Sequence, residues 1–129
     1  MKRLRGRNGD RGAAAVEFAL ILPVLVLLVL GLIEFSRVFN VQISITNAAR
    51  EGARTMAIEN DPAVARSAAI SAAPSVTPAI STGDIAISPA DCTAGSTVHV
   101  TITYTVELLS GYFGAQLPLT GTGVMRCGG

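Results

Sequence analysis

The chain has 129 residues and a formal net charge of +1, which leaves room for one modest domain. Half of its residues are apolar, but these are concentrated near the amino end. The part after Glu59 is rich in Ala, Ser, Thr, Gly and Pro, so it can bury only a small core. The near-neutral charge, the lack of Trp and the lack of a basic stripe with interleaved aromatic residues argue against a nucleic-acid-binding protein.

Positive charge is concentrated at the amino end of the chain. The basic residues there are Lys2, Arg3, Arg5, Arg7 and Arg11, against the single acidic residue Asp10. A basic cluster beside an apolar segment normally stays in the cytoplasm. The sequence therefore predicts a basic cytoplasmic leader at residues 1–12.

A long apolar run follows this leader. Thirteen of the sixteen residues from Phe18 to Ile33 are Leu, Ile, Val or Phe, which together favour membrane insertion by about 4 to 8 kcal/mol. Glu17 opposes insertion by at most about 2.5 to 3.5 kcal/mol and does not prevent it. A helix over this run is about as long as the hydrocarbon core is thick, so we expect residues 13–33 to span the membrane. Pro23 predicts a kink or a place where the helix can melt locally. A kink without any function, in an ordinary membrane anchor, is an equal alternative to a functional one.

The helical pattern continues beyond the apolar run, which argues against a cleaved secretory signal, as does the lack of an A-x-A site directly after it. Polar residues recur every three or four positions at Glu34, Arg37, Asn40, Ser44, Asn47, Glu51 and Arg54. Small and apolar residues recur likewise on another face at Val38, Val41, Ile45, Ala48 and Gly52. We therefore predict one helix from Ala13 to about Ile58, with an amphipathic extracytoplasmic half at residues 34–58.

The remaining residues, 59–129, predict a small extracytoplasmic α+β domain. Asp61 and Pro62 are a helix-start signal, and a short Ala-rich helix should follow and end before Pro74. The alternation in "TVHVTITYTVEL" predicts the clearest strand, at 97–108. Weaker strands are expected at 84–88 and 119–127, with a connecting loop at 110–118. The fold class predicted is α+β, with the amphipathic helix covering the apolar face of a three-stranded antiparallel sheet.

The two cysteines, Cys92 and Cys127, both fall in the part expected outside the cytoplasm. Thiols in an oxidising compartment tend to pair, and closing this loop would stabilise the fold by about 4 kcal/mol. Two free or buried thiols are the alternative. A metal site is not expected, because two Cys and the single His99 lack ligand spacing. His99 is expected on the solvent face of its strand.

The sequence shows no enzymatic site. No nucleophile, base and orienting acid can be assembled from it, and no Gly-rich phosphate loop precedes a helix. We therefore predict no catalytic residue, no cofactor and no small-molecule substrate.

The stretch "RGAAAVEFALILP" gives the position of Glu17 a meaning. It resembles the processing and assembly motif of type IV pilin-like proteins, specifically the TadE-like family of minor pilins in tight-adherence (Flp-type) pilus systems. The likeness continues through "LPVLVLLVLGLIEFS" and "NAAREGAR" and covers about Arg11 to Arg54. The resemblance implies that a prepilin peptidase cuts after Gly12, so that Ala13 becomes the new amino terminus.

The resemblance also implies a function and partners. Glu17 and Phe18 would be the fifth and sixth residues of the mature chain, and Glu17 would meet a free amino group during assembly. The implied protein is a pilin-like subunit of the bacterial cytoplasmic membrane with its amino terminus inside. Its partners would be other pilin subunits, the pilus assembly machinery, the peptidase and the lipid bilayer, and the pilus would serve surface attachment. The alternative is an uncleaved, single-pass anchored protein that displays a small extracytoplasmic binding domain.

Overall fold

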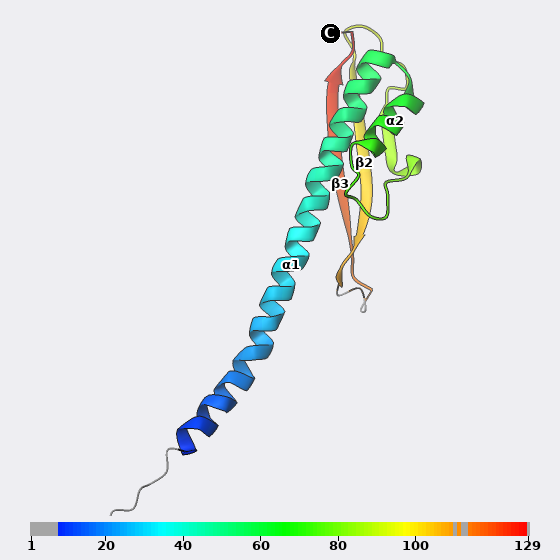
Figure 1. The fold of residues 1–129 in the computed structure, drawn as a ribbon. Coiled ribbons are helices and arrows are strands. Elements are labelled where there is room, and N and C mark those ends of the chain that lie inside the picture. Colours follow the sequence, from blue (N-terminus) through cyan, green and yellow to red (C-terminus); the bar gives the residue numbers. More distant parts are fainter. Residues whose placement is uncertain (1–7, 110, 112–113, 129) are drawn as a thin grey trace, which may run out of the picture. The chain divides into compact units, whose positions relative to one another are not determined.

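The computed structural model describes residues 8–109, 111 and 114–128, so residues 1–7 of the expected leader lie outside the described residues. The chain forms two compact units, Met1–Phe35 and Ser36–Gly129. Figure 1 shows the elements, which in chain order are α1 (Asn8–Glu59), α2 (Pro62–Ser71), the 3-10 turn η1 (Thr82–Asp84), β1 (Ile85–Ser88), β2 (Thr97–Glu107) and β3 (Gln116–Arg126). The predicted α+β class is confirmed, with one long apolar helix, a short helix and a three-stranded antiparallel sheet.

Helix α1 begins at Asn8, five residues before the predicted start at Ala13, and ends at Glu59, beside the predicted end. The run of three alanines is a strong helix former, and Asp10 in the first turn complements the helix dipole, so the helix propagates back through the leader. It also continues through Pro23. Asn60 adopts a left-handed conformation with φ of 50° and ends the helix there.

The described part of the first unit consists of α1 alone. Every residue from 9 to 33 is exposed, including the large side chains of Leu20, Leu27 and Leu32 at 67–71%. The helix that contains this stretch is long enough and apolar enough to cross a membrane. An apolar surface of this size is stable only when lipid or other protein covers it.

The second unit contains a three-stranded antiparallel sheet in the order β1-β2-β3. The short strand β1 pairs with one end of β2, and β3 pairs with β2 along its whole length, from Thr97 opposite Arg126 to Glu107 opposite Gln116. The predicted loop at 110–118 is wrong at its end, because β3 already includes residues 116–118. Pro118 is the last residue of that predicted loop, and a proline is tolerated in an edge strand where its missing N–H faces away from the ladder.

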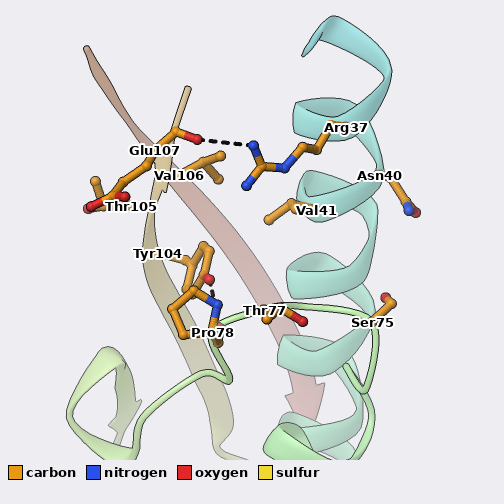
Figure 2. Close-up of a pocket in the computed structure, with 10 residues that line it drawn as sticks. All are labelled: Arg37, Asn40, Val41, Ser75, Thr77, Pro78, Tyr104, Thr105, Val106 and Glu107. Carbon is orange, nitrogen blue, oxygen red and sulfur yellow. Dashed lines mark hydrogen bonds between the residues drawn. The ribbon is translucent and has the colours of Figure 1, made fainter. Parts of the chain in front are cut away.

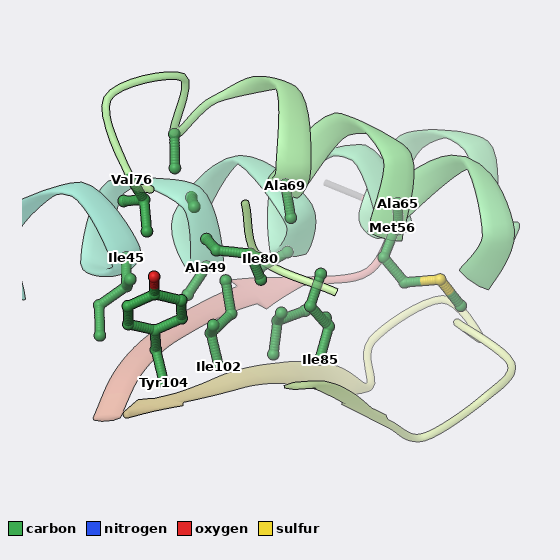
Figure 3. Packing of buried hydrophobic residues seen from close by; sticks show 14 of the residues in the cluster. Ile45, Ala49, Met56, Ala65, Ala69, Val76, Ile80, Ile85, Ile102 and Tyr104 are labelled. Carbon is green, nitrogen blue, oxygen red and sulfur yellow. The ribbon is translucent and has the colours of Figure 1, made fainter. Parts of the chain in front are cut away.

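The core lies between one face of the sheet and the two helices, as Figure 3 shows. Strand β2 buries alternate residues from Val98 to Val106, while His99 and the threonines of its other face point outward, as predicted. Helix α1 contributes Ile45, Ala48, Ala49, Ala53 and Met56, and α2 contributes Ala65 and Ala69. Most of these helical residues are small, so the backbones approach closely.

Two glycines of β3 lie directly under α1. A Cβ atom on Gly121 would come within 2.6 Å of the Ile45 carbonyl oxygen, and one on Gly123 would collide with the Ala49 carbonyl. Gly52 of α1 faces α2 in the same manner, because its Cβ would meet the Ala69 side chain at 3.1 Å. These contacts place α1 over the edge strand β3 and place α2 against another side of α1.

Helix α2 starts as the sequence predicted. The Asp61 carboxylate accepts hydrogen bonds from the Ala63 and Val64 backbone N–H groups at 2.8 and 3.3 Å, and Pro62 occupies the first turn. This arrangement satisfies two of the donors that every helix start leaves without a partner. It also fixes where the chain turns from α1 into α2.

Candidate functional site

The residues predicted for processing and assembly all lie on α1. Gly12, Ala13, Glu17 and Phe18 are helical and exposed, and Phe18 exposes 63% of its surface. They occupy the first unit, in which the described residues supply no core of their own. Their function is therefore expected in contacts with other molecules.

Gly12, the last residue of the predicted leader, lies within α1, although the helix was predicted to begin only at Ala13. A Cβ atom at Gly12 would meet nothing within 4 Å. Glycine in a helix interior costs roughly 0.5–1 kcal/mol relative to alanine, so the packing of this chain gives no reason for a glycine here. A role in recognition by another molecule would give one.

Ala13 and Glu17 are separated by four residues on the same helix. Residues at this spacing lie on one face, about 6 Å apart along the axis. An amino group created at Ala13 would therefore stand one turn from the Glu17 carboxylate of the same chain. Glu17 is itself exposed, so its carboxylate is accessible to other molecules.

A cleft of about 400 Å³ lies in the second unit, between α1, the loop after α2 and the end of β2. Figure 2 shows its lining residues, which are Arg37, Asn40, Val41, Ser75, Thr77, Pro78, Tyr104, Thr105, Val106 and Glu107. The Arg37 guanidinium donates to the Glu107 carbonyl oxygen at 3.3 Å across it. The Tyr104 hydroxyl donates to the Pro78 carbonyl oxygen at 2.7 Å at its base.

The charges around this cleft act on Tyr104. Burial raises the pKa of its hydroxyl, the positive charge of Arg37 opposes the rise, and Asp84 adds to it. The hydroxyl therefore stays protonated and remains a hydrogen-bond donor to the loop at neutral pH. Among the described residues, no three His, Cys, Asp or Glu side chains are placed to hold a metal ion. The cleft's contacts thus join β2 to α1 and to the loop.

Cys92 and Cys127 form a disulfide, as the sequence predicted, with their Cα atoms 5.5 Å apart. Cys127 is 2% exposed and also pairs through its backbone, because its N–H donates to Ser96 and its carbonyl accepts from Gly95. The disulfide therefore ties the end of β3 to the loop between β1 and β2.

Sequence reasoning missed Asn60. Its side-chain oxygen accepts from the Cys92 backbone N–H at 2.6 Å, while its own N–H bonds to the Met56 carbonyl at 3.0 Å. Asn60 thus ends α1 and holds the cysteine loop against that end. An asparagine directly after a predicted helix is a known helix-ending signal, so the sequence contained the clue.

Sequence reasoning also missed the two glycines on which α1 rests. Gly121 and Gly123 stand two residues apart and therefore on one face of their strand. A repeated glycine on one strand face indicates close approach of another backbone. That signal identifies β3 as the strand under the helix.

Comparison with known families supports the motif found in the sequence. Residues 12–54 match the family model described as TadE-like protein. No curated protein and no solved structure matches the chain. The family match confirms the resemblance drawn from the sequence: over residues 12–54 the chain is similar to TadE-like proteins, which suggests a Tad pilus-associated protein.

Proposed function

We propose that the chain is a minor pilin of a tight-adherence pilus, cut by a prepilin peptidase after Gly12 and assembled through its apolar helix. The TadE-like match begins at residue 12, which is the last residue of the proposed leader. The protein is then a substrate of the peptidase and a structural subunit, not an enzyme. Its cytoplasmic leader is residues 1–12, and its outer domain lies on the far side of the membrane.

The observation that carries this proposal is the exposed apolar stretch of α1. From residue 13 to residue 33 the only charged side chain is Glu17, and every residue is exposed. Lipid covers such a surface in the membrane, and the helices of other subunits cover it in a filament. A helix that passes from lipid to contact with other subunits does so more readily when it carries few charged side chains.

Cleavage after Gly12 serves this exchange in two ways. It removes the basic leader, which anchors the amino end at the cytoplasmic surface. It also creates an amino group at Ala13, which can neutralise Glu17 on the same helix or on a neighbouring one. A carboxylate in a low-dielectric environment is tolerated when an opposite charge meets it.

Amino-terminal sequencing of the membrane protein, with and without an active prepilin peptidase, tests the proposed cut. We expect Ala13 as the first residue when the peptidase is active and the intact leader when it is not. Gly12→Val should block processing because it places a branched side chain at the cut. Gly9→Val is the matched control, since Gly9 is also helical with open space around it.

An intact amino terminus in the presence of active peptidase would contradict the proposal. It would favour an uncleaved anchored protein that displays its outer domain. Cleavage of the Gly9→Val variant but not of the Gly12→Val variant would locate recognition at Gly12.

Glu17→Gln tests the role of the carboxylate in assembly. The substitution keeps the size of the side chain and removes its charge, so membrane insertion should remain or improve. Incorporation into sheared pili should fall strongly, because the amino group at Ala13 loses its partner. Glu59→Gln, at the exposed far end of α1, is the control and should assemble normally. Normal assembly of Glu17→Gln would remove the proposed charge pair.

A further inference from the structure

The outer edge of β3 has unpaired backbone groups. The Leu108 N–H donates to the Ala115 carbonyl at 3.2 Å and so continues the β2–β3 ladder. Because backbone groups alternate in direction along a strand, the odd-numbered residues of β3 then face β2 and the even-numbered ones face away. Gln42 of α1 supports this assignment, since it donates to the Thr120 carbonyl oxygen at 2.9 Å.

The edge is open for pairing beyond Thr120. In the described part of the chain, no hydrogen bond occupies the outward backbone groups of Thr122 and Val124. From residue 117 to 125 the strand carries no charged residue, and Val124 is 51% exposed. Natural sheets commonly protect such edges with charges or prolines, and here Pro118 protects only the end near Gln116. The rest of the edge has the form of a site for a further strand.

Two arginines flank this open edge. Gln42, Thr46 and Arg50 recur at intervals of four and share one side of α1, the side that Gln42 turns toward the edge. The Arg50 backbone lies over Gly123, and α1 crosses β3 in Figure 1. Arg126 ends the strand. Among the described residues, neither Arg50 nor Arg126 forms an ion pair, and both are exposed.

We infer that the edge of β3 from Thr122 to Arg126 binds an extended acidic segment of another protein chain as a fourth strand. Backbone hydrogen bonds to Thr122 and Val124 would supply the pairing, and carboxylates of the segment would meet Arg50 and Arg126. A second copy of β3 does not fit this chemistry, because the strand contains no acidic residue and would bring further arginines to the contact.

The test uses two synthetic peptides and the full-length protein in nanodiscs. The sequences are acetyl-TVEVTVE-amide and acetyl-TVKVTVK-amide, which share a strand-forming pattern and differ only in charge. We expect the acidic peptide to bind on the order of tenfold more tightly than the basic one. It should also slow amide hydrogen exchange at Thr122 and Val124. Equal affinity of the two peptides, or protection elsewhere, would overturn the inference.

Variants of the edge separate backbone pairing from side-chain effects. Thr122→Pro removes an outward N–H and no bond to β2, so it should abolish peptide binding while circular dichroism shows an intact fold. Thr122→Val keeps the N–H and should bind like the original chain. Arg50→Ala with Arg126→Ala should remove the preference for the acidic peptide.

Two further results would refute the inference. One is equal loss of binding in both Thr122 variants. The other is self-association of the protein through this edge that Thr122→Pro abolishes, because it would identify a second copy as the occupant. Processing at Gly12 is read separately by amino-terminal sequencing, so failure of the proposed function and failure of this site are distinguishable.

Discussion

The two units of this chain use apolar residues in opposite ways. In the first unit the large apolar side chains are exposed, as at Leu27 with 68% of its surface. In the second unit a core cluster of them is enclosed, as at Ile102, which exposes none of its surface. The same chemical property therefore leaves an apolar surface open to other molecules in one unit and stabilises the fold in the other. A substitution should consequently affect assembly in the first unit and stability in the second.

The units also differ in how closely their parts pack. The glycines that the structure describes in the first unit, Gly9, Gly12 and Gly31, have no neighbour that a Cβ atom would meet within 4 Å. Gly121 and Gly123 of the second unit lie against the helix backbone. Close packing transmits any change in volume to the whole domain, whereas an exposed helix tolerates it.

Among the substitutions that compare the two units, Gly123→Val should have the largest effect on stability. The new side chain would occupy the position of the Ala49 carbonyl, so α1 would have to separate from β3. We expect the second unit to lose more than the roughly 1–3 kcal/mol usual for overpacking and to fail to fold. Membrane insertion of the first unit should persist. Limited proteolysis of membrane fractions measures both properties.

Gly83→Val is the control for this experiment. A Cβ atom at Gly83 would meet only the Ser81 hydroxyl oxygen, at 3.7 Å, which is an ordinary contact. The second unit of this variant should resist proteolysis like that of the original chain. Equal resistance of the Gly123→Val domain would show that α1 does not rest on β3 as described.

Ile102→Ala and Leu27→Ala compare the two units directly. Removing the fully buried side chain of Ile102 should destabilise the second unit by about 2–5 kcal/mol. Leu27→Ala should leave thermal unfolding of the second unit unchanged, because Leu27 belongs to the first unit and its side chain is exposed. Unfolding monitored by circular dichroism in detergent gives both values. A similar loss in both variants would contradict the division of roles.

The sequence predicted those parts of the fold in which one periodicity dominates. The alternation of β2 identified its buried residues from Val98 to Val106, and the charge-free run identified a helical stretch that is apolar enough to cross a membrane. The signal at Asp61 and Pro62 placed the start of α2. In each case the local pattern and the tertiary packing agree, so local reasoning was sufficient.

Elsewhere, contacts between distant segments decided the outcome. Pro118 belongs to the predicted loop, but pairing with β2 drew it into β3, where its missing N–H faces away from the ladder. The early start of α1 has a local cause instead, because the adjacent alanine run favours extension of the helix backward through Gly12. The placement of α1 over Gly121 and Gly123 depends on the tertiary arrangement, which periodicity within one segment does not encode. The match to a family model confirmed the motif over residues 12–54, while the cut and the role of Glu17 stay predictions.

Asp61→Ala should have a smaller effect on stability, confined to the second unit. Its carboxylate accepts two backbone hydrogen bonds at the start of α2, and loss of such a cap costs about 1 kcal/mol. Asp91→Ala is the control, since Asp91 is exposed and a surface substitution of this kind stays within about 0.5 kcal/mol. Urea unfolding curves with unchanged slope give both values. An equal effect of the two substitutions would show that charge, and not the cap, is responsible.

The smallest effect concerns Tyr104 and pH. Tyr104→Phe removes the 2.7 Å hydrogen bond to the Pro78 carbonyl, which should cost about 1 kcal/mol at pH 7. Because burial raises the pKa of this hydroxyl, the folded chain holds the proton more tightly than the unfolded chain does. The contribution is therefore fully present below the unfolded pKa of about 10 and is lost as the pH rises through the higher folded value. The stabilities of Tyr104→Phe and the original chain should thus converge above pH 10, and curves that stay parallel from pH 7 to 11 would show that the Tyr104 hydroxyl titrates alike in both states.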